Sequence, residues 1–193
     1  MFWAFEIVND KRRYHSLMSS ASLLITSEKE VDALVEQVHA AARHLQVRLL
    51  GVGGDGLDLL RVLKFNPVGR HPLVDRPLNA IEQVNQTWTY LVAFAAVRQL
   101  LALHPEAGGF QIAPGAHAAQ ALDVMSVQEG LVGAETFAAV DPSNNQKLKA
   151  DLTKLAQRTE QHRYVFFKSP RYPGNQRIIA LEQDGIQVWS VDV

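Results

Sequence analysis

The sequence contains no cysteine among its 193 residues. This absence excludes a disulfide framework, a cysteine-ligated zinc ribbon and a thiol nucleophile. The chain also lacks any uncharged apolar run approaching the roughly 20 residues that span a bilayer. At its start, MFWAFEIVNDKRR, the basic residues follow the apolar stretch, which reverses the order of a secretory signal. These features predict a soluble, cytoplasmic protein without a membrane partner.

Two other classes of site lack their sequence signatures. The seven histidines form no His-x-x-x-His pair or other compact ligand spacing, so a zinc site is not expected. A Gly-x-Ser-x-Gly elbow is absent, which argues against a serine hydrolase. Internal repeats and low-complexity tracts are absent as well. With 47% hydrophobic and 20% charged residues, the composition is that of an ordinary globular protein.

The net charge of −1 conceals an uneven distribution. Residues 142–177 include eight basic and two acidic residues, so this segment carries +6 and the remainder −7. A basic surface attracts polyanions even on a protein that is neutral overall. A solvated helix face and loop explain the same count equally well, so the charge alone does not decide the partner.

The first part of the chain is predicted to be a small α/β unit spanning residues 1–77. Its end is marked by FNPVGRHPLVDRP, residues 65–77, where three prolines and a glycine interrupt regular structure. Upstream, Ser27 and Glu30 form a capping box at the start of an amphipathic helix. Strands are expected on both sides of this helix, at 22–26 and 46–52, with a further strand around Phe2, Phe5 and Ile7.

The second part, residues 78–193, is predicted to form a larger α/β domain with a mixed sheet. It begins with a long helix, roughly 78–104, which is apolar on much of its circumference and should be buried. A helix capped by Ser143, with Gln146 as its capping-box partner, is expected later in the chain. The remaining elements are predicted as strands at 110–113, 121–126, 131–140, 164–167 and 186–191 and a short helix at 177–182. The first three strands should form an antiparallel meander.

This α-β-β-β-α-β-α-β order, together with the acids within it, resembles the PD-(D/E)XK nuclease superfamily, which has the restriction-endonuclease-like fold. The resemblance rests on Glu82 in the long helix, Asp123 in ALDVMS, Glu135 in LVGAETFAAV and the following helix NNQKLKADLTKL. It implies that Asp123 and Glu135, assisted by Glu82, bind Mg²⁺ or Mn²⁺ for phosphodiester hydrolysis. It also implies a nucleic-acid partner, DNA rather than RNA, and is compatible with a homodimer.

The sequence departs from the family pattern in two places. Leu122 precedes Asp123 where proline is usual, and Glu135 is followed by Thr136 and Phe137, so the strand lysine is missing. Some members of the superfamily supply this lysine from the following helix, which makes Lys147 the candidate catalytic lysine. If the basic segment binds nucleic acid, the phosphate contacts are expected from Lys154, Arg158, Lys168 and Arg171.

Each acid also has a structural interpretation. Strand alternation could direct Asp123 or Glu135 to solvent, and the helix dipole favours an acid such as Glu82 in a first helical turn. The missing strand lysine leaves open a second hypothesis, a catalytically degenerate protein of the same fold that binds nucleic acid or acts as a scaffold.

A third hypothesis rests on GVGGDG, residues 51–56, which resembles the GGDG turn of NAD kinases and diacylglycerol kinases. Those families continue with threonine, whereas this chain has Leu57. The alternative is a glycine-rich turn in which Asp55 caps the next helix.

Overall fold

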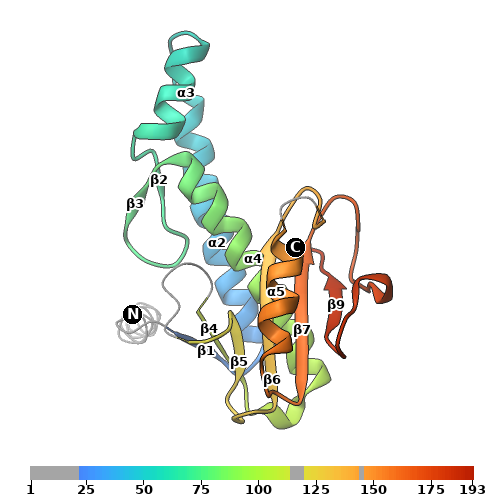
Figure 1. The fold of residues 1–193 in the computed structure, drawn as a ribbon. Helices are drawn as coiled ribbons and strands as arrows, with labels where there is room; N and C mark the ends of the chain where they lie inside the picture. The colour runs from blue at the N-terminus through green and yellow to red at the C-terminus, as the bar shows by residue number, and fades with distance from the viewer. Residues whose placement is uncertain (1–21, 114–119, 144–145) are drawn as a thin grey trace, which may run out of the picture.

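The computed structural model describes residues 22–113, 120–143 and 146–193 (Figure 1). The predicted strand around Phe2, Phe5 and Ile7 lies outside these residues. Within them the chain forms a mixed seven-stranded sheet, a separate two-stranded ribbon and four α-helices. No helix in the described part of the chain is long and apolar enough to cross a membrane.

The seven-stranded sheet combines antiparallel and parallel pairs. In spatial order its strands are β1 (Leu23–Ile25), β4 (Phe110–Ile112), β5 (Val124–Ser126), β6 (Val132–Ala138), β7 (His162–Lys168), β9 (Gln187–Ser190) and β8 (Gln176–Arg177). Strands β4, β5 and β6 form the predicted antiparallel meander. Strand β7 then pairs parallel to β6, because the chain crosses over through a helix before it returns.

The helices and the ribbon complete the fold. The helices are α2 (Glu28–Leu50), α3 (Gly56–Phe65), α4 (Ala80–Leu103) and α5 (Lys147–Ala156), and two 3-10 turns are η1 (Pro105–Ala107) and η2 (Ile179–Leu181). The ribbon pairs β2 (Gly69–Arg70) with β3 (Pro77–Leu78). The capping box at Ser27 and the helix cap at Asp55 are confirmed, and Asp55 also forms a capping box with Asp58.

The sheet is covered on both faces, and alternation along β7 separates the two cores. Tyr164 and Phe166 pack into the core formed with α2 and α4, whereas Val165 and Phe167 pack into the core formed with α5. Because successive side chains of a strand point to opposite faces, one short apolar run serves both layers. The face that α5 covers also carries Glu135, two residues before Phe137 on the same side of β6.

Three predicted elements are wrong. Residues 46–50 continue helix α2 instead of forming a strand; their apolar run has no period-2 alternation, and Val47 and Leu50 remain 68% and 81% exposed. Ser143 does not cap α5, because its N–H donates to Asp141 and Gln146 itself takes the N-cap position with φ 60°. The helix predicted at 177–182 is a 3-10 turn that follows β8.

The predicted boundary at residue 77 is crossed by both the sheet and the core. Strand β1 pairs with β4, for example Leu23 with Ile112. Ile25 and Val31 belong to the same buried cluster as residues of α4. Helix α2 therefore packs on α4 as part of the main body.

The segment from 43 to 88 extends beyond the sheet and is called the arm below. It contains the end of α2, all of α3, the β2–β3 ribbon and the start of α4 (Figure 1). Gln83 of α4 connects this helix with α2 and with β2. Its side chain donates to the carbonyl of Ala41 and accepts from the N–H of Arg70. The Gln83 side chain also fills the space beside Gly69, where a Cβ would lie 2.3 Å from its oxygen.

Candidate functional site

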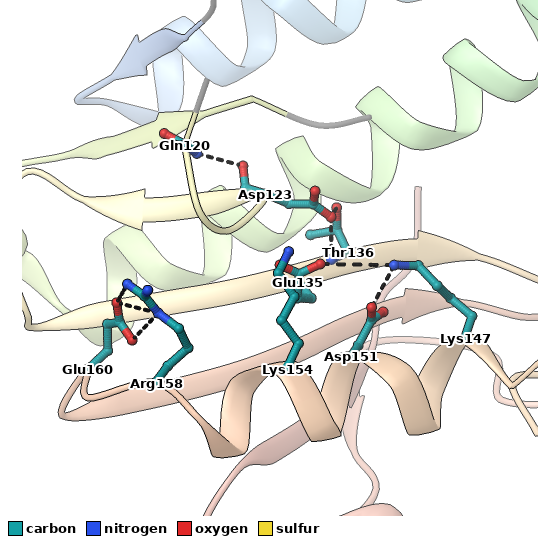
Figure 2. A network of polar contacts seen from close by, with 9 residues as sticks. All are labelled: Gln120, Asp123, Glu135, Thr136, Lys147, Asp151, Lys154, Arg158 and Glu160. Atoms are coloured by element: carbon teal, nitrogen blue, oxygen red, sulfur yellow. Dashed lines mark hydrogen bonds and ion pairs between the residues drawn. The ribbon is translucent and has the colours of Figure 1, made fainter. Parts of the chain in front are cut away.

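Two acids from neighbouring strands lie side by side at the centre of the sheet. Asp123 directly precedes β5, and Glu135 lies in the middle of β6. Since Val124 pairs with Ala134, the antiparallel register brings Asp123 opposite Glu135. The Asp123 carboxylate accepts hydrogen bonds from the Thr136 N–H at 2.9 Å and from the Thr136 hydroxyl at 3.0 Å. The sequence-predicted pair of acids is therefore brought together, and Asp123 is held in place by the strand that carries Glu135 (Figure 2).

Two lysines of helix α5 face this pair of acids. Lys154 Nζ donates to Glu135 Oε1 at 2.6 Å, and Lys147 Nζ lies 3.9 Å from Glu135 Oε2. They are seven residues apart, so they lie on one side of the helix two turns apart. Both ammonium groups reach back to the strand (Figure 2). Helix α5 thus supplies the positive charge that strand β6 lacks.

The lysine that the family pattern has two residues after the strand glutamate is replaced here by Phe137. Phe137, two residues after Glu135, points to the same face and stacks on Phe167 with the ring centroids 5.7 Å apart. A lysine at this position would interrupt the apolar core under α5. The sequence predicts Lys147 as the substitute lysine, and Lys147 does reach the site, but Lys154 makes the shorter contact with Glu135.

Asp151 is a third acid at this site, and the sequence analysis did not single it out. It lies on α5 between the two lysines and accepts a hydrogen bond from Lys147 Nζ at 2.6 Å. Its residue is only 2% exposed, and its Oδ2 atom has no hydrogen-bond partner among the described residues. The helical spacing from Lys147, four residues, was the available signal, but it is equally typical of a solvent-exposed ion pair.

A pocket of about 510 Å³ opens beside these groups. Strand β6, helix α5 and the first half of α4 form its walls, which consist of Asn85, Trp88, Thr89, Asp123, Glu135, Thr136, Phe137, Ala138, Lys147 and Lys154. Glu135 is 2% exposed, whereas the lysine side chains are 41% and 47% exposed. The acids therefore form the floor of the pocket and the lysines its solvent side.

The ionisation of the site follows from this burial. Burial raises the pKa of Glu135, the negative charge of Asp123 raises it further, and the hydrogen bond from Lys154 opposes both effects. Burial also raises the pKa of Asp151, against the hydrogen bond from Lys147. For Lys147, burial acts to lower the pKa, but the hydrogen bond and charge of Asp151 outweigh it and raise the pKa. The site holds three carboxyl groups and only two ammonium groups. The positive charges therefore do not fully offset the cost of ionising the two buried acids, Glu135 and Asp151.

Glu82, the third predicted metal ligand, lies elsewhere. It belongs to the capping box of α4, where its Oε2 accepts from the Asn79 N–H and its own N–H donates to Asn79 Oδ1. It does not line the pocket, whereas Asn85 and Thr89 from the next turn do. Helix capping is therefore the observed role of Glu82, as the structural interpretation of the sequence allowed.

The four predicted phosphate-binding residues are all engaged with acids. Lys154 contacts Glu135, Arg158 pairs with Glu160, Lys168 with Asp192 and Arg171 with Asp141. Three of these acids lie outside residues 142–177, so tertiary contacts compensate much of the charge excess of that segment. Arg171 keeps a 65% exposed side chain. Of the four, only Lys154 lines the pocket.

The glycine-rich turn at 51–56 begins helix α3. Asp55 is the N-cap residue, and its carboxylate accepts from the N–H groups of Leu57 and Asp58. The Asp58 carboxylate in turn accepts from the Asp55 N–H. Gly54 has φ 98°, a conformation that favours glycine, and a Cβ there would lie 2.8 Å from Asp58. The N–H groups of Asp55, Leu57 and Asp58 are thus used in capping.

The donor set of the pocket fits a hard divalent cation of the Mg²⁺ type. Within the described residues no three His, Cys, Asp or Glu side chains form a metal cage by themselves. Mg²⁺ does not require such a cage, because it commonly uses one or two carboxylates and completes its shell with water and substrate phosphates. Asp123 and Glu135 provide that pair, and the excess of carboxylate over ammonium charge favours an added cation.

Comparison with known proteins adds no assignment to this geometry. No family model matches the chain, and neither a curated protein nor a solved structure matches it significantly. The functional inference therefore rests on the residues of the pocket.

Proposed function

We propose that this protein is a metal-dependent nuclease that hydrolyses phosphodiester bonds in the pocket between β6, α4 and α5. The observation that carries the proposal is the convergence of Asp123 and Glu135 with Lys147 and Lys154 on that pocket. Carboxylates that can hold Mg²⁺ or Mn²⁺, next to ammonium groups that can hold phosphate oxygens, are the components of phosphoryl-transfer sites.

The chain topology supports the same proposal. A helix, α4, precedes three antiparallel strands, and a crossover helix, α5, leads to a parallel fourth strand. This is the order that the resemblance to PD-(D/E)XK nucleases implies, with an acid on the second strand and another on the third. The additional strand β1 and the arm would be elaborations of a restriction-endonuclease-like core.

In this proposal each side chain has a distinct task. Asp123 and Glu135 would hold the cation, and Thr136 fixes the orientation of Asp123 through its two hydrogen bonds. A bound divalent ion supplies a water of lowered pKa and neutralises charge that develops on the phosphate. Lys154, and Lys147 beside it, release their carboxylate partners and donate to the phosphate oxygens. Asp151 keeps Lys147 close to the pocket in the absence of substrate. The substrate is proposed to be DNA, in the cytoplasm.

A second candidate function has an observation in its favour. Both carboxylate oxygens of Glu135 lie near an ammonium group, at 2.6 and 3.9 Å. If these ion pairs persist when nucleic acid binds, Glu135 is not available to a cation. The protein would then be a catalytically degenerate nucleic-acid-binding or scaffold protein of the same fold.

One experiment separates the two candidates. The protein is incubated with single-stranded, duplex and branched DNA and with RNA, in Mg²⁺, Mn²⁺ or EDTA. We expect metal-dependent cleavage that falls by about 10²-fold or more in Asp123→Asn and Glu135→Gln, since each removes a charged ligand. Glu82→Gln is the matched acid-to-amide control and should retain full cleavage.

The possible results are clearly distinguished. Cleavage that survives in Asp123→Asn, or that Glu82→Gln abolishes equally, contradicts the assigned site. Salt-sensitive binding without cleavage supports the binding protein instead, and binding should then weaken in Lys154→Ala more than in Glu135→Gln.

A further inference from the structure

The arm exposes an unusual amount of apolar surface. Helix α3, all of whose residues are described, has six apolar side chains among its ten residues, yet none of its residues is buried. Leu57 and Leu60 are 64% and 61% exposed, and Phe65 is 73% exposed. An isolated ten-residue helix is marginal in water, and helices gain most of their stability by packing an apolar face. Within the described residues, α3 contacts α4 but leaves most of its apolar side chains exposed.

The neighbouring helices extend the same surface. At the end of α2, Val47 and Leu50 follow a spacing of three residues, and at the start of α4, Ile81, Val84 and Trp88 follow i, i+3, i+7. Each set lies on one face of its helix and is 41–81% exposed. Helix α4 contacts both α2 and α3, and these helix segments lie together in the arm (Figure 1).

The size of this surface indicates a protein interface. With ordinary side-chain areas, the exposed apolar residues of the arm together present on the order of 1,000 Å², summed over α2, α3 and α4. Each partner in a standard interface buries about 800 Å². The arm therefore offers enough area for a stable complex without any contribution from the sheet.

The charges of the arm argue for a second copy of this chain as the partner. Residues 43–88 contain six Arg or Lys and four Asp or Glu residues, so the two signs are nearly balanced. A nucleic acid would favour an excess of basic residues. In a two-fold interface identical surfaces meet, and surfaces of nearly balanced charge can do so without strong repulsion. We propose that two copies associate through their arms, with the exposed faces of α2, α3 and α4 forming a helical interface.

The proposal is tested by the mass of the full chain in solution between about 1 and 100 µM, because self-association depends on concentration. We expect wild type to reach twice 21.4 kDa. Leu50→Asp and Phe65→Asp should shift it to the monomer. Val140→Asp and Ile179→Asp are matched controls, since these residues are 78% and 73% exposed outside the arm and should leave the mass unchanged. Circular dichroism checks that each variant is folded.

The absence of native cysteine allows a second measurement. Single cysteines at Val47, Leu57 or Leu60 should include at least one that gives a disulfide-linked dimer under mild oxidation, whereas Val140→Cys should not. A wild-type protein that stays at 21.4 kDa over the whole range overturns the proposal. A dimer that the arm variants leave intact, or that the controls disrupt equally, also overturns it. The readout is mass, so the result does not depend on whether the pocket cleaves nucleic acid.

Discussion

The two halves of helix α4 lie in opposite surroundings although both are rich in apolar residues. From Leu91 to Leu100 the helix crosses the sheet, and Phe94 and Val97 are completely buried. From Ile81 to Trp88 the apolar residues on one face are exposed to solvent. The sheet covers the C-terminal half on the side of the large core, and the N-terminal half projects into the arm, where α2 and α3 cover it only in part. An apolar helix sequence thus predicts a surface that gains stability when it is covered. Only the fold shows whether another part of the same chain covers it.

The largest expected difference between the two halves of α4 is in the stability lost when one apolar side chain is truncated in each. Phe94→Ala should lower the free energy of unfolding by about 3–5 kcal/mol, because it leaves a cavity in the packed core. Ile81→Ala should change it by less than about 1 kcal/mol. Both are measured by urea denaturation in the Leu50→Asp background, which keeps self-association out of the comparison. Equal losses would mean that the arm is packed within one chain.

The second prediction compares the two lysines of the pocket, and it rests on the proposed nuclease activity. Lys154→Met should reduce cleavage by about 10²-fold, since Lys154 is the cation closest to Glu135. Lys147→Met should have a smaller effect, because Lys147 contacts Asp151 more closely than Glu135. Lys149→Met is the control on the exposed side of α5. Single-turnover rates decide the order, and a larger effect at Lys147 would exchange the two roles.

The third prediction concerns the ribbon of the arm. His71 accepts from the N–H groups of Leu73 and Val74 through Nδ1, and burial, together with the charge of Arg76, lowers its pKa from 6.5 to about 4. Between these values the unfolded chain binds a proton that the folded chain does not. Its contribution to stability is therefore present above pH 6.5 and lost as the pH falls toward 4, on the order of 2 kcal/mol.

The measurement is the slope of unfolding free energy against pH. His71→Asn keeps an acceptor in place without a titrating ring, so the slope between pH 6.5 and 4 should become shallower. His39→Asn, at a histidine of α2 outside the ribbon, should leave the slope as in wild type. An unchanged slope in His71→Asn would show that another group causes the acid sensitivity.

The smallest expected effect is a gain in stability at the site. The raised pKa of Glu135 means that the folded state favours its neutral form, so its stabilising contribution is present below about pH 4.5 and lost as the pH rises through the folded pKa. Glu135→Gln should therefore raise the unfolding free energy at pH 7 by about 1 kcal/mol, because the two exposed lysines can turn to solvent. Thermal unfolding at pH 7 and pH 4.5 checks this, and a loss of stability at pH 7 would indicate a structural ion pair instead.

Helix capping and the spacing of apolar residues predicted much of the fold. The capping box at Ser27, the cap at Asp55, the long helix α4 with its buried C-terminal half, and the meander of β4, β5 and β6 were predictable from spacing and alternation. Prediction failed where a local pattern had two solutions. The run at 46–50 could be an apolar strand or a helix; it has no period-2 alternation, and it continues α2.

The site was predictable to a similar extent. Asp123 and Glu135 attract notice because acids interrupt apolar strands, and the hairpin register then brings them together. Asp151 and the contact of Lys154 with Glu135 could not be found in this way. They depend on how α5 crosses the face of β6, and that crossing is decided by the apolar residues beneath it, Leu148, Leu152 and Leu155.

The sequence by itself determined the starts of α2 and α3, the strand alternation, the paired acids and the apolar character of the arm, because these follow from neighbouring residues. The tertiary structure decided which charges meet. It placed Glu135 against Lys154, Asp192 against Lys168 and Asp141 against Arg171, so that a segment of +6 in the sequence is largely paired in the fold. Charge compensation acts through distance in space, and residues far apart in the chain become close only when the sheet and α5 are assembled.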